Sequence, residues 1–144
     1  MKNECLLSKI NEINTISNKY LAKKIKEEGL PILQNHILLF YILPEDGSAL
    51  IFNEISNIWQ ISKSSLSDII NKYESQGIIN KCVCVEDKRS VYISLKPEGI
   101  YIRHKLKNIE AEILDLMLSN FDKDEKQSFE DNINKALNNI KKML

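Results

Sequence analysis

Short hydrogen-bonding side chains and lysines gather on one face of a helix that the sequence predicts between Ser62 and Gly77. Ser62 is a residue type that caps helices through its hydroxyl, and Gly77 stands where helices often end in a left-handed residue. One face is an apolar stripe at helical spacing: Leu66, Ile69, Ile70 and Tyr73. The other carries Lys63, Ser64, Ser65, Ser67, Asp68, Asn71 and Lys72. Such side chains suit base edges and phosphate oxygens. The alternative interpretation is a solvated helix face.

A charged turn joins two alternating, β-branched segments, residues 79–85 and 91–95, which predict a hairpin. The turn reads Glu86-Asp87-Lys88-Arg89-Ser90. An arginine on a projecting tip can enter a minor groove, where narrow A·T tracts concentrate negative potential. Asp87 can hold Arg89 in place through a charge-assisted hydrogen bond. The alternative is an ordinary surface turn with a weak ion pair.

Four short motifs keep a fixed spacing along this part of the chain: Ile61-Ser62-Lys63-Ser64, Gly77-Ile78-Ile79, Asp87-Lys88-Arg89-Ser90 and Ser94-Leu95-Lys96-Pro97-Glu98-Gly99. The pattern resembles the MarR family of bacterial transcription regulators over roughly a third of the chain, and the Asp-x-Arg-Ser piece is its most specific part. The resemblance implies a homodimer of winged-helix subunits. It also places residues 63–76 in the major groove and Arg89 in the minor groove.

The sequence departs from the family pattern at three places. Gln60 stands in the turn where the family often has glycine, which predicts a strained residue there. Lys96 replaces the usual threonine before Pro97. The first wing strand reads Cys82-Val83-Cys84-Val85 where relatives more often have basic residues, proline and aspartate, so the phosphate contact of that strand is in question.

Helices are expected on both sides of this central stretch. The periodicity predicts helices at residues 4–28, 31–43 and 51–59, and two more after Gly99, with Asp122 capping the last. The second helix is apolar nearly all round, which predicts that it is buried, and Ile55, Ile58 and Trp59 should face inward from the third. The fold class is therefore mainly α with a small β-wing. A single domain over residues 1–144 would hold a winged helix-turn-helix at 31–99 and dimerisation helices at 1–30 and 100–144.

The last helix carries an apolar stripe that the first helix of the same chain and the matching helices of a second copy can cover, so the first and last helices are interpreted as the dimerisation layer. A terminal stripe of this kind is expected to pack on a second copy, with packing inside one chain as the alternative. The candidate dimerisation residues are Leu6, Ile10, Ile13, Phe129, Ile133, Leu137 and Ile140.

Few other residues suggest chemistry. His36 and His104 lie on predicted helices that the resemblance would bring together near an effector pocket, where some relatives bind zinc, but a pair is not a ligand set and no metal site is predicted. Cys82 and Cys84 share a strand face about 6.6 Å apart and are unsuited to a disulfide. They are candidate thiol or soft-metal sensors, or simply small packed residues. Cys5 resembles the cysteine of the peroxide-sensing branch of the family.

Composition restricts the class of protein. The chain has 144 residues, net charge zero, three cysteines, and an N-terminus without a compact apolar block, so a single cytoplasmic domain is expected. Residues 60–96 carry six basic and four acidic groups, a small local excess for a DNA-binding surface. Enzyme motifs and cofactor-binding motifs are absent from the sequence.

The favoured hypothesis is a homodimeric transcription regulator that acts as a repressor, binds a near-palindromic operator and responds to a small-molecule effector. Its candidate DNA-binding residues are Ser62, Lys63, Ser64, Ser65, Ser67, Asp68, Asn71, Lys72, Asp87, Lys88, Arg89 and Ser90. The alternatives are a redox- or metal-responsive regulator of the same fold, and a winged-helix adaptor that binds protein instead of DNA.

Overall fold

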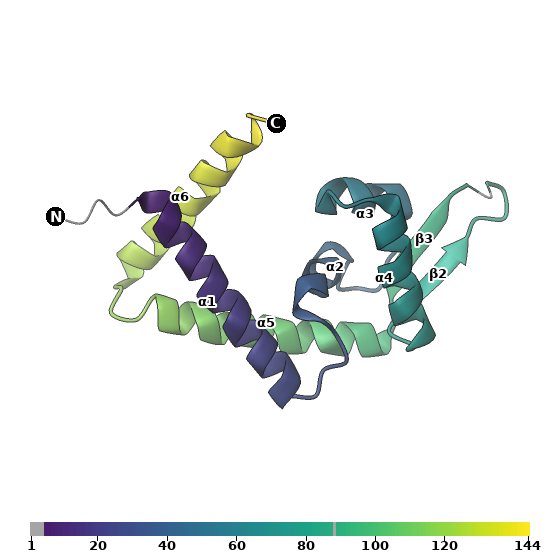
Figure 1. Ribbon diagram of the computed structural model, residues 1–144, viewed down its shortest axis with the longest axis horizontal. Helices are drawn as coiled ribbons and strands as arrows, with labels where there is room; N and C mark the ends of the chain where they lie inside the picture. The colour runs from purple at the N-terminus through teal and green to yellow at the C-terminus, as the bar shows by residue number, and fades with distance from the viewer. Residues whose placement is uncertain (1–4, 88) are drawn as a thin grey trace. The chain divides into compact units, whose positions relative to one another are not determined.

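The chain divides into two compact units, residues 1–110 and residues 111–144. The computed structural model describes residues 5–87 and 89–144. Its elements are, in order, α1 (Leu6–Glu27), the short 3₁₀ helix η1 (Gln34–His36), α2 (Ile37–Ile42), β1 (Leu50–Ile51), α3 (Phe52–Trp59), α4 (Lys63–Ser75), β2 (Ile79–Val83), β3 (Val91–Leu95), α5 (Pro97–Met117) and α6 (Lys123–Lys141). Figure 1 shows α4 beside the hairpin of β2 and β3, whose turn projects from unit 1.

The sheet has three antiparallel strands in the order β1-β3-β2, one more than the predicted hairpin. Leu50 and Ile51 pair with Ile93 and Tyr92 of β3, although Ile51 was expected to begin the third helix. A strand of two residues has no periodicity of its own, so only its partner reveals it. The strand β2 ends at Val83 rather than at residue 85, although the Cys84 amide still donates to the Ser90 carbonyl at 2.9 Å.

The prediction of a buried helix over residues 31–43 was wrong in two respects: the helix begins later, and it is not buried on all sides. Leu33 is extended, η1 and α2 begin only after it, and Leu33 and Leu38 are exposed. The Leu33 amide donates to the Tyr73 hydroxyl, 3.2 Å away on α4. This tertiary hydrogen bond gives the amide a partner outside a helix, which the apolar pattern of residues 31–43 could not indicate.

The core of unit 1 lies where α2, α3, α4 and α5 meet the sheet. Its fully buried side chains include Leu39, Phe40, Leu43, Ile55, Leu66, Ile70, Tyr73, Ile78, Ile79, Ile93, Ile102 and Leu106. Ile58 is 59% exposed, contrary to its predicted inward orientation, because α3 turns the side of Ile55 and Ser56 toward the core.

The turn between α3 and α4 confirms the strain expected at Gln60, which adopts a left-handed conformation with φ of 60°. Its amide donates to the Ser56 carbonyl at 2.8 Å. The buried Ser56 hydroxyl donates to the Ile61 carbonyl at 3.1 Å. These bonds satisfy the backbone of a turn that a non-glycine residue would otherwise disfavour, and they fix where α4 begins.

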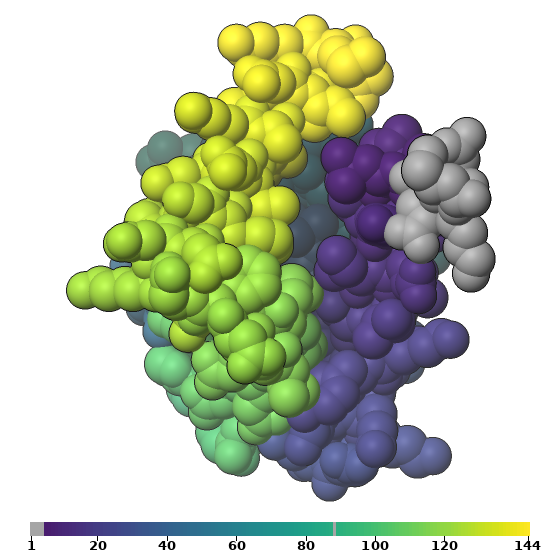
Figure 2. Space-filling model, turned by 90° about the vertical axis from the view of Figure 1, so that its left-hand side faces the viewer, coloured from purple at the N-terminus to yellow at the C-terminus, as the bar shows by residue number. Residues whose placement is uncertain are grey.

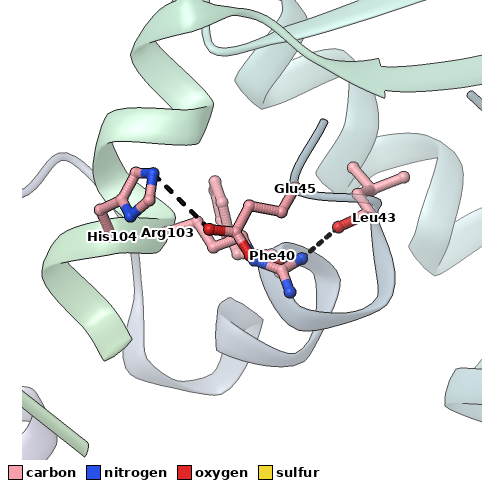
Figure 3. A network of polar contacts seen from close by, with 5 residues as sticks. All are labelled: Phe40, Leu43, Glu45, Arg103 and His104. Atoms are coloured by element: carbon pink, nitrogen blue, oxygen red, sulfur yellow. Dashed lines mark hydrogen bonds and ion pairs between the residues drawn. The ribbon is translucent and has the colours of Figure 1, made fainter. Parts of the chain in front are cut away.

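Arg103 of α5 joins the end of α2 to the long helix (Figure 3). Its guanidinium donates to the carbonyls of Phe40 at 3.0 Å and Tyr41 at 3.4 Å, and also to that of Leu43. The last carbonyls of a helix lack partners within it and carry partial negative charge, so a cation stabilises them. The remaining residue pair in Figure 3, His104 and Glu45, has its closest atoms 3.7 Å apart.

Unit 2 contains the end of α5 and all of α6, whose surface is yellow in Figure 2. Asp122 caps α6 as predicted: its carboxylate accepts from the Glu125 amide at 2.8 Å. The Glu125 carboxylate accepts in turn from the Asp122 amide at 3.2 Å, which completes a capping box. The hydrogen bond from the Glu125 amide lowers the pKa of the Asp122 carboxyl, because it stabilises the charged form.

Candidate nucleic-acid interface

The beginning of α4 is ordered by a small network of serine hydroxyls. Ser62 caps the helix as predicted, with its hydroxyl accepting from the Ser65 amide at 3.2 Å. The same hydroxyl donates to the Ser65 hydroxyl at 2.9 Å and lies 3.4 Å from that of Ser64. Ser62 therefore positions the first turn, and its hydroxyl is already engaged there.

The polar face of α4 lies at the surface, as its residue types predicted. Leu66, Ile70 and Tyr73 are buried and Ile69 is half-buried, so the opposite side is left to solvent. The side chains of this face are exposed in Lys63, Ser64, Ser65, Asp68 and Asn71, and half-buried in Ser67 and Lys72. The Lys72 ammonium lies over the Tyr73 ring, 5.5 Å from the ring centroid, which is a cation–π distance.

The wing is the antiparallel pair of strands β2 and β3, with five paired residues on each strand. Its register pairs Ile79 with Leu95 and Val83 with Val91. At the tip, the Asp87 carboxylate accepts from the Arg89 amide and from the Ser90 hydroxyl, both at 3.0 Å. The predicted bond between Asp87 and the arginine thus goes to the backbone amide of Arg89 and not to its guanidinium. The side chain of Arg89 is exposed, and Lys88 lies outside the described residues.

Tyr73 of α4 contacts η1 through its hydroxyl and its ring. Its hydroxyl lies 2.7 Å from Nδ1 of His36, and the two rings meet edge to face with centroids 5.6 Å apart. The hydroxyl accepts from the Leu33 amide, so its hydrogen is free to be donated to His36. Burial raises the pKa of the Tyr73 hydroxyl and, together with the charge of Lys72, lowers the pKa of His36.

The pH dependence of stability follows from His36. Its folded-state pKa lies below the ordinary value of 6.5, so between these two pH values the unfolded chain binds more protons. The free energy of unfolding should therefore fall as pH drops through 6.5 and level off below the folded-state pKa. His36→Asn, which keeps an acceptor for Tyr73 without titrating, should flatten this part of the curve in urea titrations at several pH values. An unchanged slope in the variant would contradict the assignment.

A cavity of about 560 Å³ lies beside the polar face of α4. Its lining comes from η1, the end of α3 and the first turns of α4: Asn35, His36, Trp59, Ile61, Ser62, Ser65, Asp68 and Ile69. A second cavity, of about 330 Å³, is lined by the end of α1 and the segment that leads to η1.

The two histidines, for which no metal site was predicted, have different neighbours. His36 lies against Tyr73 and Trp59, whereas His104 lies against Glu45. Within residues 5–87 and 89–144, no three His, Cys, Asp or Glu side chains could hold a metal ion. Cys5 and Cys82 are exposed, Cys84 is half-buried, and all three are free thiols. Their role as sensors stays a prediction.

Two residues that the sequence did not single out make tertiary hydrogen bonds, and of these Lys81 contacts the polar face of α4. Lys81 of β2 donates from its ammonium to Oδ1 of Asn71 at 3.2 Å, and Arg103 holds the end of α2. Lys81 follows the buried Ile79 by two residues, so strand alternation could have placed it toward α4. Nothing in the spacing pointed to Arg103.

Comparison of the structure with solved structures gives a consistent result. A MarR transcriptional regulator from Methanosarcina mazei Go1 matches with a TM-score of 0.83 and 20% identity, over 95% of this chain and 96% of that one. The chain has the MarR fold. Wild-type MarR from E. coli matches this fold with a TM-score of 0.76 and 16% identity, over 95% and 99% of the two chains.

A third structure with the MarR fold was solved with DNA. It is a MarR-family regulator from Listeria monocytogenes complexed with a 26mer, with a TM-score of 0.77 and 20% identity over 95% of this chain and 89% of that one. No protein-family model matches the sequence, and no curated protein matches it. None of the described helices is long and apolar enough to cross a membrane.

Proposed function

We propose that this protein is a cytoplasmic transcription regulator that binds DNA as a homodimer and represses from a near-palindromic operator. The observation that carries the proposal is the exposed polar face of α4 next to an ordered wing tip with an exposed Arg89. The DNA complex of the Listeria monocytogenes regulator supports it, because that protein has the same fold. Residues 1–144 would act as one domain, and catalysis has no part in this function.

Each part of the surface has a separate role in the proposal. Lys63 and Ser64 would contact phosphates at the start of α4, while Ser65, Ser67, Asp68 and Asn71 would face bases of the major groove. Lys72 would add charge near the backbone. Asp87 and Ser90 keep the wing turn in shape through the hydrogen bond between them, and Arg89 would enter the minor groove.

The homodimer is supported by apolar side chains that stay exposed in the single chain. On α1 these include Leu6, Ile10 and Ile13, and on α6 they include Ile133, Leu137 and Ile140. Phe129 is half-buried, with its ring against that of Phe121 at a centroid distance of 6.1 Å, so it contributes less free surface. Stripes of this kind on helices of 22 and 19 residues suit packing against a second copy.

An effector would act through the junction between the dimerisation helix α1 and the winged helix. The cavity of about 330 Å³ at the end of α1 lies at such a junction within unit 1, and its volume falls in the range of small-ligand pockets. A small molecule bound there would shift the equilibrium between forms that differ in the separation of the two recognition helices.

The experiment that tests the function is selection of bound sequences from random duplex DNA by the purified protein. The proposal predicts enrichment of a near-palindromic motif with half-sites about one helical turn apart. It also predicts retention on a heparin column that salt abolishes. Flow-through that does not depend on salt, with no enriched motif, would favour the protein-binding adaptor instead.

Replacing Arg89 with alanine should weaken operator binding about ten-fold and reduce the salt dependence by roughly one counterion, because one groove contact is lost. The measurement is a mobility-shift titration at several salt concentrations. Sedimentation should show that the variant assembles as the parent does. Arg89→Lys keeps the charge and serves as the control; unchanged affinity in Arg89→Ala would contradict the assignment of the wing.

A further inference from the structure

Lys81 of the wing strand β2 forms a hydrogen bond with Asn71 of α4. The strand β2 packs on α4, as Figure 1 shows, and Lys81 lies on the side of β2 that carries the buried Ile79. Its ammonium donates to Oδ1 of Asn71 at 3.2 Å. Asn71 is exposed on the polar face of α4, so this contact acts on a side chain that is available to a ligand.

The contact fixes which end of the Asn71 amide is presented outward. An ammonium has three donors and no acceptor, so it must meet the oxygen of the amide. The NH₂ group of Asn71 then points away from Lys81. Together the two side chains offer N–H donors to a ligand, and the Lys81 ammonium takes one of the two lone pairs of the Asn71 oxygen.

We propose that Lys81 determines the base that Asn71 reads, and that the pair selects guanine over adenine; this rests on the proposed DNA-binding function. A free asparagine reads adenine by accepting from N6 and donating to N7. Guanine presents two acceptors, N7 and O6, to the major groove. A pair of side chains that offers donors therefore fits guanine, whereas the amino group of adenine would have to share the Asn71 oxygen with the Lys81 ammonium.

The test is selection from random duplex DNA by four proteins: the parent, Lys81→Met, Asn71→Ala and the double variant. The position that Asn71 reads is the one at which Asn71→Ala loses its base preference. The parent should prefer guanine over adenine there by about ten-fold. Lys81→Met should shift the preference to adenine, because the freed amide can again accept and donate. In the double variant the preference should be lost, as in Asn71→Ala.

Lys96→Met is the matched control, since Lys96 is an exposed lysine just after β3. It removes the same charge and should keep guanine. Guanine retained in Lys81→Met, adenine in the parent, or a motif unaffected by Asn71→Ala would each overturn the inference. These outcomes differ from failure of the proposed function, in which the parent itself enriches no motif.

Discussion

Changing Ile133 and Ile140 together to glutamate should abolish dimerisation and weaken operator binding by about a hundred-fold or more. Both side chains lie on the apolar stripe of α6 and are 52% and 57% exposed in the single chain. A dimer would bury both positions. Each buried, unpaired glutamate carboxylate would cost roughly several kcal/mol, which is enough to separate the subunits. A lone subunit can reach only one half-site, so it loses the gain from simultaneous binding.

The control for this prediction adds the same two charges to the other side of α6. Ser128→Glu and Asn138→Glu lie at exposed positions about opposite the stripe. This variant should remain dimeric in sedimentation velocity and keep its operator affinity. If the Ile133 and Ile140 variant stays dimeric and binds DNA normally, α6 has no part in the assembly.

Replacing Gly99 with alanine should lower the free energy of unfolding by about 2–3 kcal/mol, although alanine is the better helix former. Gly99 lies in the first turns of α5, and a Cβ there would be 2.5 Å from the carbonyl oxygen of Ile78. That carbonyl also accepts a hydrogen bond from the Lys96 amide at 3.0 Å, so the atom that the added Cβ would meet is fixed backbone and not a flexible side chain. The clash could be relieved only if α5 moved away from the Ile78 carbonyl, which directly precedes β2.

Gly77→Ala is the comparison for this prediction. Gly77 has φ of 74° and no neighbour within 4 Å of an added Cβ, so the cost there is backbone strain alone, about 1 kcal/mol. Urea unfolding of both variants should show the larger loss for Gly99→Ala. A gain in stability at Gly99 would mean that α5 and the wing are not packed this closely.

Most of α4 and the wing could be predicted from the sequence because their signals are local. The Ser62 cap, the stripe of Leu66, Ile70 and Tyr73, and the left-handed Gly77 each depend on neighbours within a few residues. The hairpin likewise depended on its own alternation. These elements formed where the pattern indicated, except that β2 ends at Val83 and not at residue 85.

The features that were missed depend on distant partners. The strand β1 exists because Leu50 meets Ile93, and the extended Leu33 gives its amide to Tyr73, forty positions later in the chain. The hydrogen bond from Lys81 to Asn71 joins β2 to α4, and the periodicity within each element does not indicate how the two elements pack together. Ile58 was placed inward with Ile55 and Trp59, yet α3 turns the side of Ile55 and Ser56 toward the core, which leaves Ile58 exposed and Trp59 half-buried.

The measurement that most directly tests the proposed mode of action is sedimentation velocity at micromolar protein, alone and with a selected operator duplex. We expect a dimer in the absence of DNA and a complex of two chains with one duplex in its presence. A single chain that sediments alone and adds to the duplex one at a time, or that leaves the duplex unshifted, would contradict the proposal.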